Sequence, residues 1–293
     1  MKHKLPRTRR RRRLLCLLAA LLILLAFLLR QNVLLGTVSK YALLMDAQTG
    51  QVLARKRANE EAAPASLTKM MTVWLAVEAL PDLDAMVALP EDIFPALTAA
   101  DASMAGFEPG EEVSVRDLLY GAMLPSGAEC CETLARVVCG SEEAFVARMN
   151  QRTGELGLEH THFANPTGLT DPEHYSSAAD LAVLLQAALQ NETFRTVFTA
   201  AEYTSSTTAQ HPQGLHMVST LLSKLNGTEI PGGQILGGKT GYTEAAGLCL
   251  ASLAQVNGKE YILVTLDAPG SHRTEQYNID DAVQVYRRLV DKK

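Results

Sequence analysis

Strand-like segments stand at both ends of this sequence, and helical patterns fill the middle. Residues 41–46 and 51–54 are typical of two short strands that turn at 48–50, where the chain reads Gln-Thr-Gly. Near the other end, the apolar runs 248–256 and 261–266 are joined by Asn-Gly, the dipeptide typical of a two-residue hairpin. This order predicts one antiparallel sheet assembled from both termini, covered by helices and carrying a helical insertion.

Residues 64–80 show the strongest helical pattern in the chain. Pro64 and Ser66 are helix start signals, and apolar residues then recur at helical spacing. Residues 86–112 are interrupted by prolines and glycines, so we expect short strands and loops there. The other predicted helices span 115–124, 128–138, 141–156, 177–189 and 280–289.

Ser66 and Lys69 are three residues apart, so on a helix their side chains share one face. A serine hydroxyl becomes a good nucleophile when a base takes its proton, and a lysine amine kept neutral by burial can be that base. Unpaired backbone N–H groups at a helix N-terminus also favour an oxyanion there. Taken alone, however, the pair is more typical of a helix cap followed by a solvated lysine.

Two further motifs change that interpretation. Residues 126–128 (Ser-Gly-Ala) lie between two predicted helices, where by themselves they are most simply a turn and a helix cap. Residues 239–243 (Lys-Thr-Gly-Tyr-Thr) open the C-terminal strands. The lysine and threonine supply a cation and a hydroxyl suited to a carboxylate, and the glycine lets a ligand or another backbone approach closely.

In this order the three motifs match the Ser-x-x-Lys, Ser-Asp-Asn and Lys-Thr-Gly set of serine β-lactamases and penicillin-binding proteins. The sequence resembles that superfamily, and most closely the D-alanyl-D-alanine carboxypeptidases, the low-molecular-mass penicillin-binding proteins. The resemblance extends from about Tyr41 to Leu289 and implies a β-lactamase/transpeptidase-like fold of the α/β class (α+β type), with a five-stranded antiparallel sheet. It also includes Asp117-Leu118-Leu119-Tyr120, Phe163-Ala164-Asn165-Pro166 with Gly168-Leu169, and His174-Tyr175-Ser176.

The resemblance implies a role for each matching residue. Ser66 would attack the carbonyl between the two terminal D-alanines of a peptidoglycan stem peptide, and Lys69 would take its proton. Ser126 and Lys239 would pass a proton to the leaving D-alanine. The backbone N–H groups of Ser66 and Tyr242 would form the oxyanion hole, and water would hydrolyse the acyl-enzyme. The implied substrate-binding residues are Thr240, Gly241, Tyr242 and Arg273, of which Thr240 and Arg273 would hold the terminal carboxylate.

Two positions weaken the match. Arg273 is matched by position alone, so a surface charge is the alternative interpretation. The family usually has asparagine where Ala128 stands, and alanine cannot donate a hydrogen bond to substrate or orient Lys69. Either the enzyme is slower because a donor is missing, or the site has been rebuilt around alanine, for example with Glu129 or Cys130 in the vacated space.

Two other functions are alternatives to a carboxypeptidase. A catalytically weak or silent peptidoglycan-binding member would be consistent with Ala128 but not with the other motif residues. A serine β-lactamase of class A needs a Glu-x-x-x-Asn segment to activate water, and here Asn165 has Thr161 four residues before it. The resemblance favours the carboxypeptidase, with β-lactam antibiotics as acylating inhibitors and with no metal or other cofactor.

Residues 1–36 differ in composition from the rest. Eight lysines and arginines, with no acid among them, precede an uninterrupted apolar run at 14–29, as in a secretory signal or signal-anchor. No convincing cleavage site follows, which favours an uncleaved signal-anchor over a cleaved signal peptide. The positive-inside rule keeps the basic end in the cytoplasm. We therefore expect 1–36 to be a cytoplasmic basic tail with its signal segment, and 37–293 to be a catalytic domain outside the bacterial cell membrane.

The remaining composition limits the partners. The net charge is −5 although the basic tail is strongly positive, so the rest of the chain is acidic. It lacks basic patches with interleaved aromatic residues, which argues against a nucleic-acid partner. The five cysteines show no metal-ligand spacing. Beyond Cys16 we expect reduced core residues, although a disulfide from Cys249 stays open, and we expect a monomer.

Overall fold

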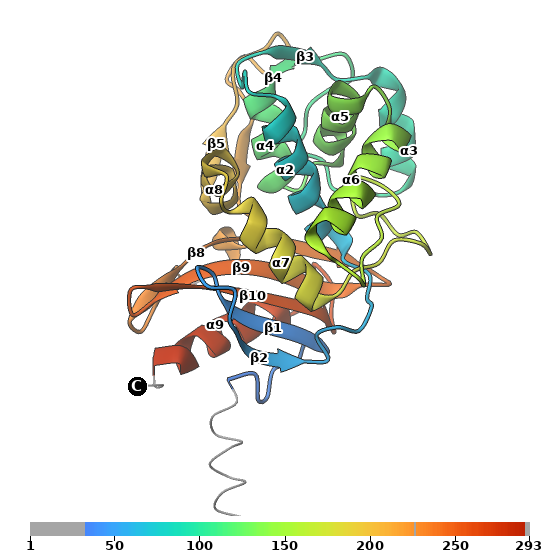
Figure 1. The fold of residues 1–293 in the computed structure, drawn as a ribbon. Coiled ribbons are helices and arrows are strands. Elements are labelled where there is room, and N and C mark those ends of the chain that lie inside the picture. The colour runs from blue at the N-terminus through green and yellow to red at the C-terminus, as the bar shows by residue number, and fades with distance from the viewer. Residues whose placement is uncertain (1–32, 226, 291–293) are drawn as a thin grey trace, which may run out of the picture.

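One antiparallel sheet joins the two ends of the chain (Figure 1). The structure is a computed structural model that describes residues 33–225 and 227–290. The strand order is β2-β1-β10-β9-β8-β7. Tyr41 in β1 lies opposite Leu266 in β10, so the first and last strands along the chain are neighbours. The strands are β1 (Tyr41–Asp46), β2 (Val52–Lys56), β7 (Glu229–Ile230), β8 (Gly233–Thr243), β9 (Gly247–Val256) and β10 (Lys259–Ala268).

The predicted fold class and the assembly of the sheet from both termini are confirmed. The sheet has six strands rather than five because the two-residue β7 pairs with the start of β8. The hairpin between β9 and β10 turns at Asn257 and Gly258, both of which have positive φ, 51° and 78°. A two-residue turn of this kind matches the right-handed twist of the strands, which is why Asn-Gly predicts it.

Helix α9 (Tyr277–Val290) covers one face of the sheet. Its buried residues Ala282, Val285 and Tyr286 share an apolar cluster with residues from β1, β9 and β10. Val33 and Leu34 are buried in the same cluster, and the Arg288 guanidinium donates hydrogen bonds to the carbonyl oxygens of residues 33 and 35. The packed structure therefore begins at least four residues before the predicted domain start at residue 37.

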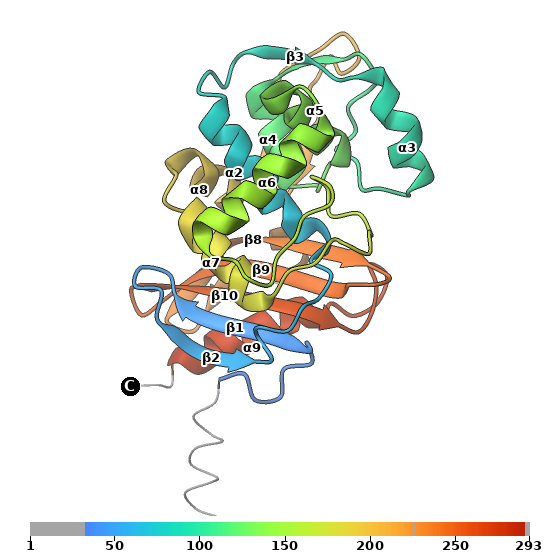
Figure 2. The ribbon, with the colours of Figure 1, turned by 45° about the vertical axis from the view of Figure 1, so that its right-hand side comes forward.

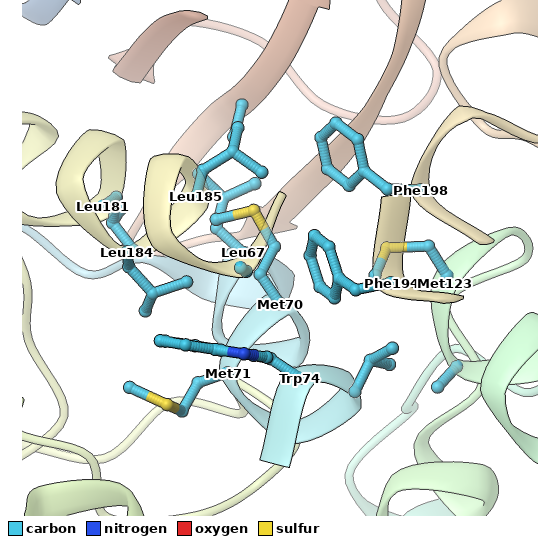
Figure 3. Packing of buried hydrophobic residues seen from close by; sticks show 14 of the residues in the cluster. Leu67, Met70, Met71, Trp74, Met123, Leu181, Leu184, Leu185, Phe194 and Phe198 are labelled. Carbon is cyan, nitrogen blue, oxygen red and sulfur yellow. The ribbon is translucent and has the colours of Figure 1, made fainter. Parts of the chain in front are cut away.

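A helical region covers the opposite face of the sheet, with α7 lying on the strands (Figures 1 and 2). At its centre, α2 is buried from its first residue through residue 77. Figure 3 shows Met70 and Trp74 of α2 among side chains of α7 and α8. A helix that is apolar on every side is typically buried in a core. The helices of this region are α2 (Lys69–Ala79), α3 (Phe94–Ala99), α4 (Val115–Met123), α5 (Ala128–Cys139), α6 (Glu142–Leu156), α7 (Ala178–Ala188) and α8 (Glu192–Thr199).

The predicted helices are confirmed to within a few residues, but α3 and α8 were missed. Pro95 suggested a loop, yet it lies in the first turn of α3, where a missing N–H costs nothing. Asn191 caps α8 by accepting hydrogen bonds from the next turn, a start signal that the sequence does contain. The small sheet of β3 (Met86–Ala88) and β4 (Glu112–Ser114) agrees with the short strands expected over 86–112, whereas the sheet of β5 (Glu202–Thr204) and β6 (His216–Val218) was missed.

Several predictions on the N-terminal segment fall outside the described residues. The basic tail and the apolar run at 14–29 belong to residues 1–32, so the signal-anchor stays a prediction. In the described part of the chain, every helix is too short or too polar to cross a membrane. The four cysteines in that part all carry free thiols, so Cys249 forms no disulfide with any of the others.

Candidate active site

Ser66 lies in a short 3-10 helix, Ala65–Thr68, that runs directly into α2. Lys69 is the first residue of α2, and its Nζ lies 3.0 Å from Ser66 Oγ and 2.6 Å from the carbonyl oxygen of Thr167. Ala65, immediately before the serine, has a φ of +47°, a left-handed conformation that non-glycine residues rarely adopt. The predicted serine–lysine pair therefore exists, and its backbone is held in an unusual conformation.

Two lysine amines are buried together at this site. The Lys69 side chain is almost wholly buried, and this loss of hydration lowers its pKa, with a smaller opposing effect from Cys131 and Glu129. Lys239 is fully buried, so desolvation and then the nearby charge of Lys69 lower its pKa well below that of an ordinary lysine. Burial of both amines therefore favours the neutral form, which is what a general base requires.

Strand β8, which carries Lys239, Thr240, Gly241 and Tyr242, packs on the turn that holds Ser66. Gly241 packs against the backbone of Ser66, and the Lys239 amine donates a hydrogen bond to the carbonyl oxygen of Thr240 at 3.0 Å. The two hydroxyl oxygens of Thr240 and Thr220 lie 2.7 Å apart. The sequence carried no signal for Thr220, which the fold brings to this strand from a separate loop.

Ser126 lies in the turn between α4 and α5. It has a φ of +73°, and its hydroxyl is buried without a hydrogen-bond partner among the described residues. Such a residue combines backbone strain with an unused polar group, and both features cluster at functional sites. Ser126 also lies two residues before Ala128, which lines the same cleft as Ser66 and Lys69.

The cleft has a volume of about 500 Å³. Its lining includes the loop 100–103 as well as Tyr242 and His272, whose rings meet edge to face with centroids 4.7 Å apart. Arg273 is exposed and does not line the cleft itself, although its neighbour His272 does. The structure thus groups Ser66, Lys69 and β8, and leaves Arg273 at the rim.

Ala128 is 1% exposed and packs in a small apolar cluster beneath loop 100–103, with Leu97, Met104 and Leu169 among its neighbours. Its backbone N–H donates to the carbonyl oxygen of Ser103 at 2.8 Å. Position 128 therefore combines apolar packing with a place on the cleft that holds Ser66 and Lys69, and both interpretations of the alanine, a missing donor or a rebuilt site, stay predictions.

The two residues suggested as replacements for the missing amide, Glu129 and Cys130, make contacts elsewhere. Glu129 is buried, and its Oε1 accepts hydrogen bonds from the backbone N–H groups of Ala105 and Gly106, which fixes the cleft wall to α5. Cys130 packs against Gly121, where an added β-carbon would lie 2.5 Å from its sulfur. Neither side chain lines the cleft.

Comparison with known proteins agrees with this geometry. The family model described as D-alanyl-D-alanine carboxypeptidase matches residues 32–270. The chain is 37% identical over 236 residues to the D-alanyl-D-alanine carboxypeptidase DacF of Bacillus subtilis, a match that covers 78% of this chain and 57% of that protein. It is 33% identical over 231 residues to DacB2 of Mycobacterium tuberculosis, with 76% and 73% covered.

The fold is also similar to solved structures. The crystal structure of the Streptomyces K15 DD-transpeptidase superposes with a TM-score of 0.75 at 29% sequence identity, over 86% of this chain and 97% of that one. The match to DacC of Escherichia coli covers 60% of that relative. The chain therefore spans less than two thirds of several of the relatives it matches, including DacF.

Proposed function

Because the chain belongs to the D-alanyl-D-alanine carboxypeptidase family, we propose that it removes the terminal D-alanine from peptidoglycan stem peptides through an acyl-enzyme on Ser66. One observation carries the proposal: the Ser66 hydroxyl lies 3.0 Å from a buried lysine amine whose pKa is lowered. A neutral amine at that distance can accept the hydroxyl proton as the oxygen attacks a carbonyl.

Each of four side chains has a role in the proposed acylation step. Ser66 Oγ forms the new ester bond, and its proton goes to Lys69 Nζ. As the amide bond breaks, the leaving D-alanine nitrogen takes a proton through Ser126, whose unpartnered hydroxyl supports this role. The Lys239 amine assists this transfer as a hydrogen-bond donor. Water then attacks the ester and releases the shortened peptide.

Negative charge on the carbonyl oxygen needs preorganised donors. The Ser66 backbone N–H belongs to the first turn of a helical segment, where amides lack partners within the helix. We assign it as one donor and the N–H of Tyr242 as the other, because β8 packs directly on this turn.

We assign the binding of the substrate carboxylate to Thr240 on β8 and to Arg273. Thr240 already shares a hydrogen bond with Thr220, so its hydroxyl is oriented before substrate binds. Arg273 at the rim supplies the complementary charge. The same pocket would accept β-lactam antibiotics, which acylate Ser66 in place of the peptide.

We further propose that the domain works outside the bacterial cytoplasmic membrane, where peptidoglycan lies. The basic and apolar residues before position 30 support this location and a membrane tether. A monomer without nucleic-acid partners suffices for the reaction, since the proposed groups all come from one chain.

Fluorescent-penicillin labelling of the purified protein, combined with measurement of D-alanine release from a peptide ending in D-Ala-D-Ala, tests the proposal. We expect wild type to be labelled and active, and Ser66→Ala to lose both properties. Lys69→Ala should fold normally and lose about 10²–10⁴ in rate, the usual effect of a general base. Folded wild-type protein that neither labels nor releases D-alanine would favour a silent peptidoglycan-binding member instead.

A further inference from the structure

We propose that His174 is a positioning residue for Ser66, acting through the Thr68 hydroxyl and the Ala65 carbonyl. This inference rests on the proposed function, because it concerns the same nucleophile. His174 belongs to the loop between α6 and α7 and does not line the cleft, so its effect must be indirect.

The hydrogen bonds around His174 fix one protonation state and one direction. The backbone N–H of Ala164 donates to Nδ1 at 3.0 Å, so Nδ1 carries no proton. The proton of the neutral ring is therefore on Nε2, which donates to Thr68 Oγ1 at 2.7 Å. The Thr68 hydroxyl in turn donates to the carbonyl oxygen of Ala65 at 2.8 Å.

This chain of bonds ends on the peptide group that contains the Ser66 N–H. A hydrogen bond accepted by the Ala65 carbonyl polarises that peptide and strengthens its N–H as a donor to an oxyanion. The same bond restrains Ala65 at its φ of +47°, a conformation that surrounding contacts have to maintain. His174 thus acts on both the direction and the strength of one proposed oxyanion donor.

The loop that carries His174 also holds the base. The carbonyl oxygen of Thr167 accepts a hydrogen bond from Lys69, and that of Pro166 accepts one from Thr72 at 2.6 Å. At Gly168 an added β-carbon would lie 1.9 Å from the Ala65 carbonyl oxygen, so the loop backbone touches the strained turn directly. One loop therefore sets the positions of nucleophile and base together.

Burial keeps the ring neutral. His174 is 4% exposed, its ring meets the edge of Phe163, and desolvation lowers its pKa to about 4. Three titratable groups act on it: Asp171 on its own loop raises the pKa, whereas His162 and Lys69 lower it. Above pH of about 4 the relay is intact, and below it a proton on Nδ1 would face the Ala164 N–H and break that bond.

The test compares His174→Ala and His174→Gln in the full-length protein, with fluorescent-penicillin acylation and D-alanine release as readouts. Glutamine can donate with its Nε2 and accept with its Oε1, so it can restore both bonds. We expect His174→Ala to lose roughly tenfold to a hundredfold in acylation and kcat with little change in KM, the scale of a small misplacement. His174→Gln should recover most of the rate.

Two further variants separate positioning from general stability. Thr68→Val removes the relay hydroxyl at similar volume, so it should lower acylation as His174→Ala does, and the double variant should lose no more than either single one. His162→Gln, on the same loop but without contact to Thr68, should acylate as wild type does. Wild-type rates in folded Thr68→Val would overturn the inference, even if His174→Ala fails to fold.

The pH profile provides a readout that a purely structural role would not move. Protonation of Lys69 lowers acylation at acid pH in both proteins, but below pH of about 4 the wild-type rate should fall more steeply than that of His174→Gln. A second readout, the reaction of Ser66 with a small sulfonyl fluoride, keeps this test separate from the proposed function, because it needs neither a peptide nor a β-lactam. Equal sulfonylation rates in wild type, His174→Ala and Thr68→Val would refute the positioning role, whereas failure of the wild type to release D-alanine would refute the proposed function alone.

Discussion

The α-carbon of Gly241 faces the backbone nitrogen of Ser66. A β-carbon added at Gly241 would lie 3.0 Å from that nitrogen and 3.1 Å from the β-carbon of Ala65. Both distances are shorter than ordinary van der Waals contact. Strand β8 therefore reaches the nucleophile only because position 241 has no side chain.

Gly241→Ala should consequently push β8 away from Ser66 by a few tenths of an ångström. We expect penicillin acylation to fall roughly tenfold to a hundredfold, because small displacements at a reacting centre are costly. The matched control is Gly154→Ala on α6, where an added β-carbon meets nothing within 4 Å. That variant should acylate normally and gain about 0.5–1 kcal/mol in stability. Normal acylation of Gly241→Ala would contradict the proposed contact.

The pH dependence of acylation should follow the lowered pKa of Lys69. Only the neutral amine can accept the Ser66 proton, so the rate should rise as pH rises through that pKa. It should then level off at a lower pH than about 10.4, where an ordinary lysine loses its proton. A rate profile measured from pH 4 to 11 decides this, and a rate still rising at the upper end would show an unperturbed lysine.

Lys239→Met should separate stability from activity. The amine of Lys239 is fully buried and its pKa is lowered, so the unfolded chain binds more protons than the folded one between the folded pKa and about 10.4. The contribution of Lys239 to the free energy of unfolding therefore rises with pH in that window. Methionine has no such dependence, so the variant should be more stable at neutral pH by about 0.5–2 kcal/mol, with a gain that shrinks toward pH 10. Urea unfolding at pH 7 and 10 measures this, while D-alanine release should be lost.

Ala128→Asn should not improve the enzyme. Its amide would enter a cluster formed by Leu97, Met104 and Leu169, where overpacking or an unpaired polar group costs about 1–3 kcal/mol. We expect a lower midpoint in urea and an acylation rate equal to or below that of wild type. A tenfold gain in acylation would instead show that the protein lacks a donor that asparagine restores.

Removal of residues 33–36 should destabilise the domain. Val33 and Leu34 are each 2% exposed, and full burial of one such side chain contributes about 1.5–3 kcal/mol. A chain that starts at residue 37 should unfold at markedly lower urea concentration than one that starts at residue 33. Coincident unfolding curves would place the start of the packed domain at residue 37, as the sequence suggested.

Local signals made much of this structure predictable. Ser66 and Lys69 are three residues apart, and helix periodicity alone brings them together. The hairpin at Asn257 follows from backbone conformations that few residue pairs adopt. In contrast, the tertiary fold alone brings Thr220 to Thr240, and no sequence pattern near residue 220 predicts that contact.

One error has a physical reason. Proline at residue 95 suggested a loop, although the first turn of a helix tolerates it. The contacts of Ala128 could not be predicted, because its apolar neighbours come from α3 and two loops that are distant in sequence. Whether a donor is missing there or the site is rebuilt around alanine stays a prediction.

The strand order also determines when, during synthesis of the chain, the proposed site around Ser66 can form. Ser66 emerges early, but the strand that faces it, β8, and the partner of β1, β10, emerge near the end. Until then β1 lacks its partner β10, and the serine turn has neither the Lys239 amine nor the Tyr242 backbone beside it. A ribosome that stalls before residue 233 therefore releases a chain that carries the nucleophile but cannot acylate. The proposed catalysis therefore cannot begin until β8 and β10 have both been synthesised and paired.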